Sequence, residues 1–460
     1  MTPIDANAGA VPATEPLAAV ASSPPPTVTG RSGPRRWRAP LGPTLARPLA
    51  GGLLVAIVAC VAWIVLEAAA GRSPLVPPQP IVAGYLSGIA SRLSFDDFLI
   101  ALLVMTACYA GVLALARRIP ARWAIVAVVA LHVVVLAGPI IISQDIFSYL
   151  AYGRLGVLHG IDPYSHGPSA APHDAIYRFV GLQWRHRAAV YGPIFTLISY
   201  PLAGLGLVGG VWAMKVIATV ASLATVALVW LCARRLGRDP VAATLLVGLN
   251  PILILYGLGG AHNELIMTAM AMAAVWWVLG GRDARGAAAV VAATAVKATA
   301  GVLLPFMLLA RRSLGVVVGA AAAVVGIGVV AYIAFGVHAL DFVSGLSKQQ
   351  FFVSTDSFPN EVAHTLGFPG VYPGDRKFLT LGLIIVLVYL AVRVWRGYDW
   401  ISATALALVA IAVSSTWLLA WYTLWGLPLA AVARDRRVLV VLLAVQGLFL
   451  IHQLSPLLTP

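Results

Sequence analysis

The chain has 460 residues, of which 60% are hydrophobic and only 10% are charged. A soluble globular protein carries about a quarter charged residues, so this composition excludes an ordinary soluble domain and favours a polytopic membrane protein. The net charge of +14 does not indicate a nucleic-acid partner, because most arginines flank apolar runs, where they orient spans and meet anionic membrane lipids.

The first 48 residues are rich in Ala, Pro, Ser and Thr, and this composition predicts a disordered tail. Five arginines precede the first apolar run, and no short apolar segment with a cleavage site comes earlier in these residues. We therefore expect a retained cytoplasmic tail rather than a signal peptide. Residues 49–460 are then expected to form a single transmembrane domain.

Apolar runs of roughly 17–25 residues recur after this tail, and each is long enough to cross a bilayer as a helix. The predicted fold class is all-α, with clear spans at 49–70, 97–116, 121–142, 208–233, 240–258, 263–281, 314–336, 376–394, 399–417, 418–433 and 438–455. Residues 190–207 are ambiguous and predict a short or re-entrant helix. Residues 286–310 predict a hairpin of two short helices with Lys297 at its outer tip.

We expect this arrangement in the cell membrane, where the arginine-rich loops orient it. If the N-terminus is cytoplasmic and the chain crosses the membrane about 13 times, all of the arginine-rich loops lie on the cytoplasmic side. The long loops 143–189 and 337–375 then lie outside, together with seven of the nine histidines. Long loops on a compact membrane body are usually functional, so we expect the active site to be extracytoplasmic.

The first outer loop opens with "SQDIFSYLAYGRL" at 143–155. Asp145, Tyr149 and Tyr152 share one helix face, which predicts an amphipathic helix at the membrane interface. Asp145 has two interpretations. It either caps this helix, or it acts as a general base whose pKa is raised by partial desolvation.

The loop continues with "HGIDPYSHGP" at 159–168, where Asp162 and Tyr164 are candidates for binding sugar hydroxyls. His159, His166 and His173 are spaced by seven across prolines and share no helix face. The three cysteines lie singly inside apolar runs, which suggests neither a disulfide framework nor a zinc site. We expect no metal site and no cofactor. "YGPIF", which begins at Tyr191, leads back into the membrane.

Three later segments also carry polar or aromatic groups at the outer side. In "GGAHNELIM", His262, Asn263 and Glu264 either cap the next helix or contact substrate. Lys297 either reaches the headgroup layer or has a functional role. In "SSTWLLAWYTLWGLPLAA", the spacing of Trp417, Trp421 and Trp425 predicts a helical stripe, which is either an interfacial belt or a groove for a lipid chain or sugar.

Together these segments resemble the GT-C glycosyltransferases, which take sugars from polyprenyl-phosphate carriers. The stretches "QDIFSYLAYGRLGVLHGIDPYSHGP", "HNEL" and "STWLLAWYTLWGLPLAA" are similar to the actinobacterial polyprenol-phosphate-mannose-dependent α-1,6-mannosyltransferases of lipomannan and lipoarabinomannan synthesis. The resemblance covers residues 50–455 in layout. One departure is Ala420, where relatives carry proline within the Trp-rich motif.

The resemblance implies that Asp145 deprotonates an acceptor hydroxyl in one inverting step that releases polyprenyl phosphate. It implies that Lys297 and Arg154 stabilise the leaving phosphate. The implied partners are a polyprenyl-phosphate-mannose donor, a mannosylated glycolipid acceptor and membrane lipids. The implied substrate-binding residues also include Tyr149, Tyr152, Asp162, Tyr164, Tyr191, His262, Asn263, Glu264, Trp417, Trp421 and Tyr422.

Two other functions remain open at this point. A GT-C enzyme could transfer another sugar, such as arabinofuranose, because a few side chains of the folded pocket distinguish one hydroxyl orientation from another. A lipid or sugar transporter is disfavoured, because such proteins usually show inverted repeats with a polar site near the bilayer midplane. The sequence shows no convincing internal repeat.

Overall fold

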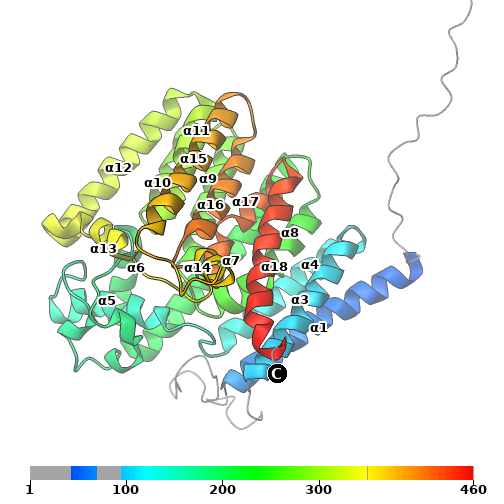
Figure 1. Cartoon of the computed structure of the whole chain (residues 1–460), viewed down its shortest axis with the longest axis horizontal. Helices are drawn as coiled ribbons and strands as arrows, with labels where there is room; N and C mark the ends of the chain where they lie inside the picture. Colours follow the sequence, from blue (N-terminus) through cyan, green and yellow to red (C-terminus); the bar gives the residue numbers. More distant parts are fainter. Residues whose placement is uncertain (1–42, 70–94, 350, 459–460) are drawn as a thin grey trace, which may run out of the picture. The chain divides into compact units, whose positions relative to one another are not determined.

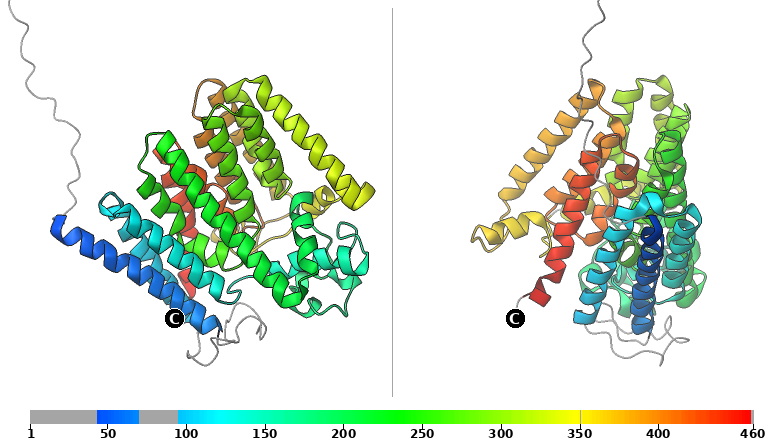
Figure 2. Two further views of the ribbon diagram at one scale, coloured as in Figure 1. Left: turned by 180° about the vertical axis from the view of Figure 1, so that it is seen from behind. Right: turned by 90° about the vertical axis from the view of Figure 1, so that its right-hand side faces the viewer.

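The computed structural model describes residues 43–69, 95–349 and 351–458, and every regular element in these ranges is a helix (Figures 1 and 2). The predicted all-α fold class is confirmed. The first helix begins at Pro43, six residues before the predicted span, because proline is tolerated in the first helical turn. The rest of the predicted tail lies outside the described residues.

Six helices in the described ranges are long and apolar enough to cross a bilayer. They correspond to six of the predicted spans and comprise α1 (Pro43–Ala69), α3 (Phe95–Leu115), α7 (Gly206–Arg235), α12 (Leu314–Phe335), α15 (Asp375–Trp395) and α18 (Arg436–Leu458). The remaining apolar helices are shorter and include α4 (Ala121–Ala137), α9 (Glu264–Leu279) and α16 (Trp400–Ser414). The figure of about 13 crossings stays a prediction.

The predicted span 240–258 is not one straight helix. It consists of α8 (Pro240–Gly248) and a π-helical segment, η5 (Ile252–Leu258), which are bent by 48°. Pro251 lies at the break and cannot donate a backbone hydrogen bond. Asn250 stabilises the bend, because its Oδ1 accepts from the backbone N–H groups of Ile252 and Leu253 at 3.0 and 3.1 Å.

The two ambiguous regions both form short helices. Residues 190–207 contain α6 (Pro193–Ala203). Residues 286–310 lie within α10 (Asp283–Thr294), the 3-10 turn η6 (Ala298–Val302) and α11 (Leu303–Arg311) and the short breaks between them. The chain breaks in an extended conformation at Lys297, so the prediction of two short helices on either side of this lysine is confirmed.

The Trp-rich segment differs from its prediction, because α16 ends at Ser414 and no single helix covers 418–433. Instead, a 3-10 turn, η8 (Ala420–Leu424), precedes the short helix α17 (Leu427–Val432). Backbone groups around Thr416 are bound from another loop, since the Ser354 N–H donates to the Thr416 carbonyl at 2.9 Å. The prediction of a helical stripe through Trp417, Trp421 and Trp425 is therefore wrong.

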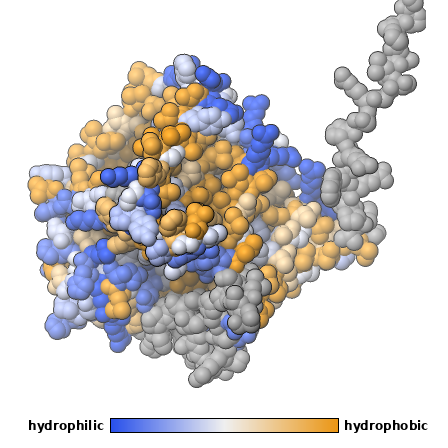
Figure 3. All heavy atoms as spheres, viewed as in Figure 1, coloured by the Kyte–Doolittle hydropathy of each residue, from blue (hydrophilic) through white to orange (hydrophobic). Residues whose placement is uncertain are grey.

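Helix packing positions the segments that carry the polar residues. α10 packs against both α9 and α12, and α5 (Asp145–His159) packs against α6. On the face drawn in Figure 3, hydrophobic residues cover most of the helices, and hydrophilic residues gather where Figure 1 places α5 and the chain that follows it. This distribution fits a membrane protein with a polar region at one end of its helices.

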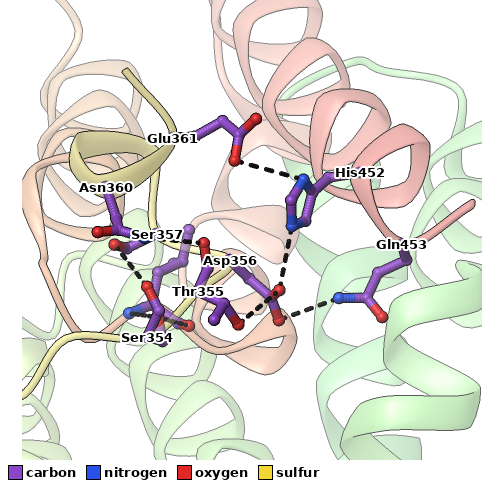
Figure 4. Close-up of polar contacts among 9 residues, drawn as sticks. Ser354, Thr355, Asp356, Ser357, Asn360, Glu361, His452 and Gln453 are labelled. Carbon is purple, nitrogen blue, oxygen red and sulfur yellow. Dashed lines mark hydrogen bonds and ion pairs between the residues drawn. The ribbon is translucent and has the colours of Figure 1, made fainter. Parts of the chain in front are cut away.

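The second long loop, 337–375, contains α13 (Phe342–Gln349) and α14 (Phe358–Thr365). Figure 4 shows how this loop is tied to α18. The two nitrogens of His452 lie 3.3 Å from Asp356 Oδ1 and 3.6 Å from Glu361 Oε2, while Gln453 Nε2 donates to Asp356 at 3.0 Å. The loop is thereby attached to the last helix.

Candidate active site

Asp145 is the first residue of α5, and the N-cap position belongs to Gln144. The Asp145 carboxylate caps no helix amide among the described residues, whereas its backbone N–H donates to Ser143 Oγ at 3.1 Å. The capping interpretation is therefore wrong. The carboxylate, with 15% of its side chain exposed, is free to face a pocket.

Most of α5 is buried inside the protein, so the prediction of an amphipathic helix at the membrane interface is wrong. Residues 146–153 are all buried. Gly153 permits this packing, because a Cβ atom there would lie 2.3 Å from the Ser199 carbonyl oxygen of α6. Tyr149 lies within this buried face, and its hydroxyl is 3.2 Å from His262 Nδ1.

The turn before α9 carries three consecutive polar side chains that are 0 or 1% exposed: His262, Asn263 and Glu264. The preceding residue, Ala261, has a positive φ of 50°, a left-handed conformation that is uncommon for a non-glycine residue. Asn263 occupies the N-cap position of α9, but its side chain makes no capping hydrogen bond. Capping by this side chain is thus excluded.

His262 connects the turn to α5 and to the Trp-rich segment. Its ring stacks on Trp421 with centroids 3.8 Å apart and an angle of 21° between the planes. Its Nδ1 atom lies 3.6 Å from Asp145 Oδ2. His262 Nε2, both amide atoms of Asn263 and Glu264 Oε2 have no hydrogen-bond partner in the described part of the chain.

Lys297 points into the protein and forms an ion pair with the buried Glu264. Its ammonium also lies over two aromatic rings, 4.7 Å from the centroid of Tyr422 and 5.4 Å from that of Trp425. A cation held over aromatic faces is stabilised by their negative π-surfaces. These contacts exclude a lysine that merely extends to the lipid headgroups.

The "YGP" segment is held beside Lys297 by backbone contacts. The Gly192 N–H donates to the Val296 carbonyl at 3.3 Å, and the Ile194 N–H donates to the Ala295 carbonyl at 3.0 Å. A Cβ atom on Gly192 would lie 2.2 Å from the Ala295 oxygen, so only glycine permits this approach. The adjacent Tyr191 ring meets Tyr149 edge to face, with centroids 5.0 Å apart.

These elements surround one pocket. Six of the predicted site residues line it: Asp145, Tyr149, Tyr191, Lys297, Trp421 and Tyr422. His262 and Glu264 contact Asp145 and Lys297 at its wall. Sequence reasoning did not single out Trp184, Val190, Ala298, Leu346 or Leu419, which also line the pocket. Apart from the aromatic ring of Trp184, these residues carry no chemical signal that the sequence could reveal.

Other predicted residues lie outside the pocket lining and support the surrounding structure. Arg154 Nε donates to Asp174 at 2.8 Å, and His159 binds the same carboxylate at 2.7 Å. Asp162 accepts from the Tyr164 N–H at 2.8 Å. Arg154 is therefore already bound to a carboxylate, away from the phosphate-stabilising position predicted for it.

Two tyrosines and one tryptophan of the predicted set have similar supporting contacts. The Tyr152 hydroxyl donates to the Arg187 carbonyl at 3.0 Å. The Tyr164 hydroxyl donates to the Tyr191 carbonyl and contacts Thr196 Oγ1, both at 3.0 Å. Trp417 packs on Phe352 with ring centroids 5.3 Å apart. These contacts link the two long loops, 143–189 and 337–375, to the pocket wall.

Burial sets the protonation chemistry of the pocket. The pKa of Asp145 is raised to about 7, because burial and then the nearby charge of Glu264 raise it and Lys297 only partly opposes them. Burial and then the charge of Lys297 hold the pKa of His262 well below its usual range. Near neutral pH the pocket thus combines a neutral imidazole with a carboxyl group that readily gains or loses a proton.

Comparison with known proteins places the chain in a family of membrane glycosyltransferases. A family described as "Alpha-(1->6)-mannopyranosyltransferase, N-terminal domain" matches residues 49–313, which is more than half of the chain. This protein belongs to that family. No solved structure gives a significant match.

Curated relatives carry the same description. Alpha-(1->6)-mannopyranosyltransferase A of Mycobacterium tuberculosis is 30% identical over 340 residues, which cover 66% of this chain and 64% of the relative. The Corynebacterium glutamicum protein of that name is 30% identical over 176 residues, 38% of this chain and 35% of the relative. Alpha-(1->6)-mannopyranosyltransferase B of Corynebacterium glutamicum is 32% identical over 155 residues, 33% of this chain and 25% of the relative. The chain thus spans less than two thirds of each of these relatives.

Proposed function

We propose that this protein transfers mannose from polyprenyl-phosphate-mannose to a growing α-1,6-mannan, the core of lipomannan and lipoarabinomannan, at the outer face of the cell membrane. The names of the relatives support the mannosyl transfer and its linkage. The observation that carries the proposal is a pocket with a carboxylate of raised pKa, Asp145, and an ammonium, Lys297, in its lining. A carboxylate and a cation are what glycosyl transfer from a lipid phosphate requires.

In the proposed reaction, Asp145 accepts the proton of the acceptor 6-hydroxyl as its oxygen attacks C1 of the donor mannose. The C1–O bond to phosphate breaks, and its electron pair leaves with the polyprenyl phosphate. Attack from the face opposite the phosphate converts a β-linked mannosyl phosphate into an α-mannoside. One proton moves from the acceptor to Asp145, and no redox step is involved.

Two neighbouring groups assist this step in different ways. The Lys297 ammonium stabilises the negative charge that develops on the leaving phosphate. His262 is a positioning residue, because its neutral ring is stacked on Trp421 and its Nδ1 lies within 3.6 Å of both the Asp145 carboxylate and the Tyr149 hydroxyl. The aromatic wall of Tyr191, Trp421 and Tyr422 suits the apolar face of a sugar ring.

The direct test is a transfer assay with radiolabelled polyprenyl-phosphate-mannose and a short α-1,6-mannoside acceptor. We expect wild type to form product and Asp145→Asn to lose about 10²–10⁴-fold of the rate, the usual contribution of a general base. Asp341→Asn is the matched control, because Asp341 lies in the other long loop and pairs with His338 at the surface. Equal rates for wild type and Asp145→Asn would contradict the role of Asp145 as the base. Product formed only from an arabinofuranosyl donor would contradict the proposal that mannose is the transferred sugar.

A further inference from the structure

A groove with a volume of about 660 Å³ runs between α1 and α4, apart from the candidate active site. Residues of α1 between 51 and 59 and residues of α4 between 122 and 130 line it. On each helix the lining residues recur at helical spacing, so one face of each helix forms one wall. The lining is apolar except for the guanidinium of Arg122 and the indole N–H of Trp123. Its length of eight residues corresponds to roughly 12 Å.

Two arginines belong to the same end of the groove. A Cβ atom on Gly51 would lie 3.4 Å from the Trp123 ring, so the beginning of the α1 wall faces the beginning of the α4 wall. Arg122 is the second residue of α4, and Arg47 precedes Gly51 by one helical turn on the same face of α1. Both arginines are exposed. The groove therefore has one basic end and continues as an apolar channel.

The charge at this end is not neutralised within the protein. Neither Arg47 nor Arg122 forms an ion pair with a carboxylate in the described part of the chain. Arginine beside a bilayer attracts anionic headgroups, and its planar guanidinium can bind a phosphate through two N–H groups. Trp123 lies at the same end, and tryptophan is enriched at the level of the headgroups. This end is therefore complementary to a lipid phosphate.

The rest of the groove is accessible from the bilayer. Val55 and Val126 belong to its lining, and they are 69% and 66% exposed. α1 is a candidate membrane span, and Figures 1 and 2 show it at an edge of the helices. Small residues at Gly51, Ala59 and Ala130 leave room for a chain to pack closely, which is what stabilises contacts inside a membrane. An acyl chain could enter this groove laterally.

We propose that the groove between α1 and α4 binds an anionic phospholipid, with its phosphate at Arg47 and Arg122 and one acyl chain along the apolar lining. This site is separate from the candidate active site. Arg122 lies roughly 22 Å along α4 from Ala137, the end of the helix that leads to Asp145. In the orientation proposed above, the basic end faces the cytoplasmic leaflet, which is rich in anionic lipids. The site does not depend on which sugar the enzyme transfers.

A second copy of the chain is a less suitable occupant of this groove. Two copies in one membrane are related by an axis along the membrane normal, so equivalent helix ends meet. Packing through the groove would place Arg47 and Arg122 of one copy near the same arginines of the other. Such a contact brings like charges together, whereas a lipid phosphate compensates them.

The test measures lipid binding to the purified, delipidated protein by native mass spectrometry. The probes are dioleoyl phosphatidylglycerol, which is anionic, and dioleoyl phosphatidylcholine, which has the same chains and no net charge. We expect wild type to bind one phosphatidylglycerol about five-fold or more tightly than phosphatidylcholine. Arg122→Gln should abolish this preference, because a basic residue near the membrane surface contributes about a five-fold change in affinity. Arg122→Lys should retain most of it, which separates loss of charge from damage to the fold.

The apolar lining is tested by a second pair of variants. Ala59 lines the groove and is exposed, so Ala59→Phe should fill the groove and weaken binding of both lipids at least five-fold. Ala114 of α3 is also exposed but lies outside the lining, and Ala114→Phe should bind both lipids like wild type. Arg396→Gln is the control for charge, because Arg396 is an exposed arginine at the end of α15. It should keep the preference for phosphatidylglycerol.

Four results would contradict the proposal. Equal affinity of wild type for the two lipids would exclude recognition of the phosphate by charge. Unchanged binding in Ala59→Phe would exclude the groove as the site. An equal loss of preference in Arg396→Gln and Arg122→Gln would show only a general attraction to the basic surface. A dimer of wild type that is dissociated by Ala59→Phe would assign the groove to a second copy of the chain.

Discussion

Two carboxylates and one ammonium share the wall of the candidate active site, and their geometry divides their roles. Lys297 pairs directly with Glu264, whereas the Asp145 carboxylate lies 3.6 Å from the His262 ring. A buried carboxylate without a direct cation favours its protonated form, so the pKa of Asp145 is raised. This arrangement leaves Asp145 able to exchange a proton near neutral pH.

The raised pKa of Asp145 predicts how the transfer rate depends on pH. The base must be ionised to accept a proton, so kcat/KM should rise about ten-fold per unit below pH 7 and level off above it. His262 should add no second inflection near neutral pH, because its pKa is held low. The check is kcat/KM measured between pH 5.5 and 8.5 with unfolding monitored in parallel. A rate that is constant over this range would argue against Asp145 as the base.

The same pKa has the opposite consequence for stability. The pKa of Asp145 is higher in the folded chain than in the unfolded chain, so between about pH 4 and pH 7 the folded state holds a proton that the unfolded state has lost. The free energy of unfolding should therefore fall as pH rises through this window. Asp145→Asn removes this ionisation, and its melting temperature at pH 8 should equal or exceed that of wild type.

The buried pair of Lys297 and Glu264 predicts separable effects on folding and activity. Lys297→Met leaves Glu264 as an uncompensated buried charge, which typically costs about 3–5 kcal/mol, so the melting temperature should drop. The double variant Lys297→Met with Glu264→Gln should recover most of this stability. Thermal unfolding and mannosyl transfer are measured on the same preparations.

If Lys297 contacts the leaving phosphate, the double variant should remain inactive although it folds. Glu264→Gln alone serves as the control, since it retains the ammonium and is expected to keep measurable transfer. Recovery of activity together with stability in the double variant would mean that Lys297 has only a structural role.

At the scale of elements, the site depends on short breaks between helices rather than on long helices. The break at Lys297 between α10 and η6 is held against the start of α6, where Gly192 approaches the Ala295 carbonyl. The turn after η5 places His262 against Trp421 of the 3-10 turn η8. Irregular backbone at membrane depth is tolerated where it is buried in protein or lines a cavity, as it does here.

The contact of Gly192 predicts a large effect for a single added methyl group. In Gly192→Ala the new Cβ would lie 2.2 Å from a backbone oxygen, so the loop that carries Lys297 must move. We expect the free energy of unfolding to fall by about 1–3 kcal/mol and the transfer rate to fall at least ten-fold. Gly204→Ala at the end of α6 is the control, because the nearest atom would be 3.7 Å away. Similar behaviour of both variants in thermal melts and transfer assays would contradict this account.

At the scale of the whole molecule, apolar helices separate basic turns from the polar loops that surround the candidate site. The loops 143–189 and 337–375 meet at the pocket, where Trp184 comes from the first and Leu346 from the second. The pairing of Asp356 and Glu361 with His452 attaches the second loop to α18 (Figure 4). We propose that this side faces outward, as a lipid-linked donor requires.

Cysteine labelling tests this orientation. In a background without Cys60, Cys108 and Cys232, we place a cysteine at Leu182, which is 74% exposed in the first outer loop, or at Leu236, in the basic turn after α7. A membrane-impermeant maleimide should label the cysteine at 182 in intact cells. The cysteine at 236 should react only after the membrane is permeabilised. The reverse pattern would place the candidate site on the cytoplasmic side.

The sequence by itself determined the class of the fold and most of the chemistry. Continuous apolar runs can cross a bilayer only as helices, so the six long helices were predictable. Asp145, Tyr191, His262 and Lys297 stood out because polar residues beside apolar spans are costly unless they have partners. The segments that contain these residues also carried the resemblance of the chain to a known family.

Only the tertiary structure decided which of these residues meet. Arg154 and Lys297 look alike as outer cations, yet packing binds one to Asp174 and directs the other to Glu264 in the pocket. The spacing of the tryptophans predicted a helix, but hydrogen bonds from Ser354 hold Thr416 in a non-helical segment. Such contacts join segments that are tens of residues apart, and local sequence periodicity contains no information about them.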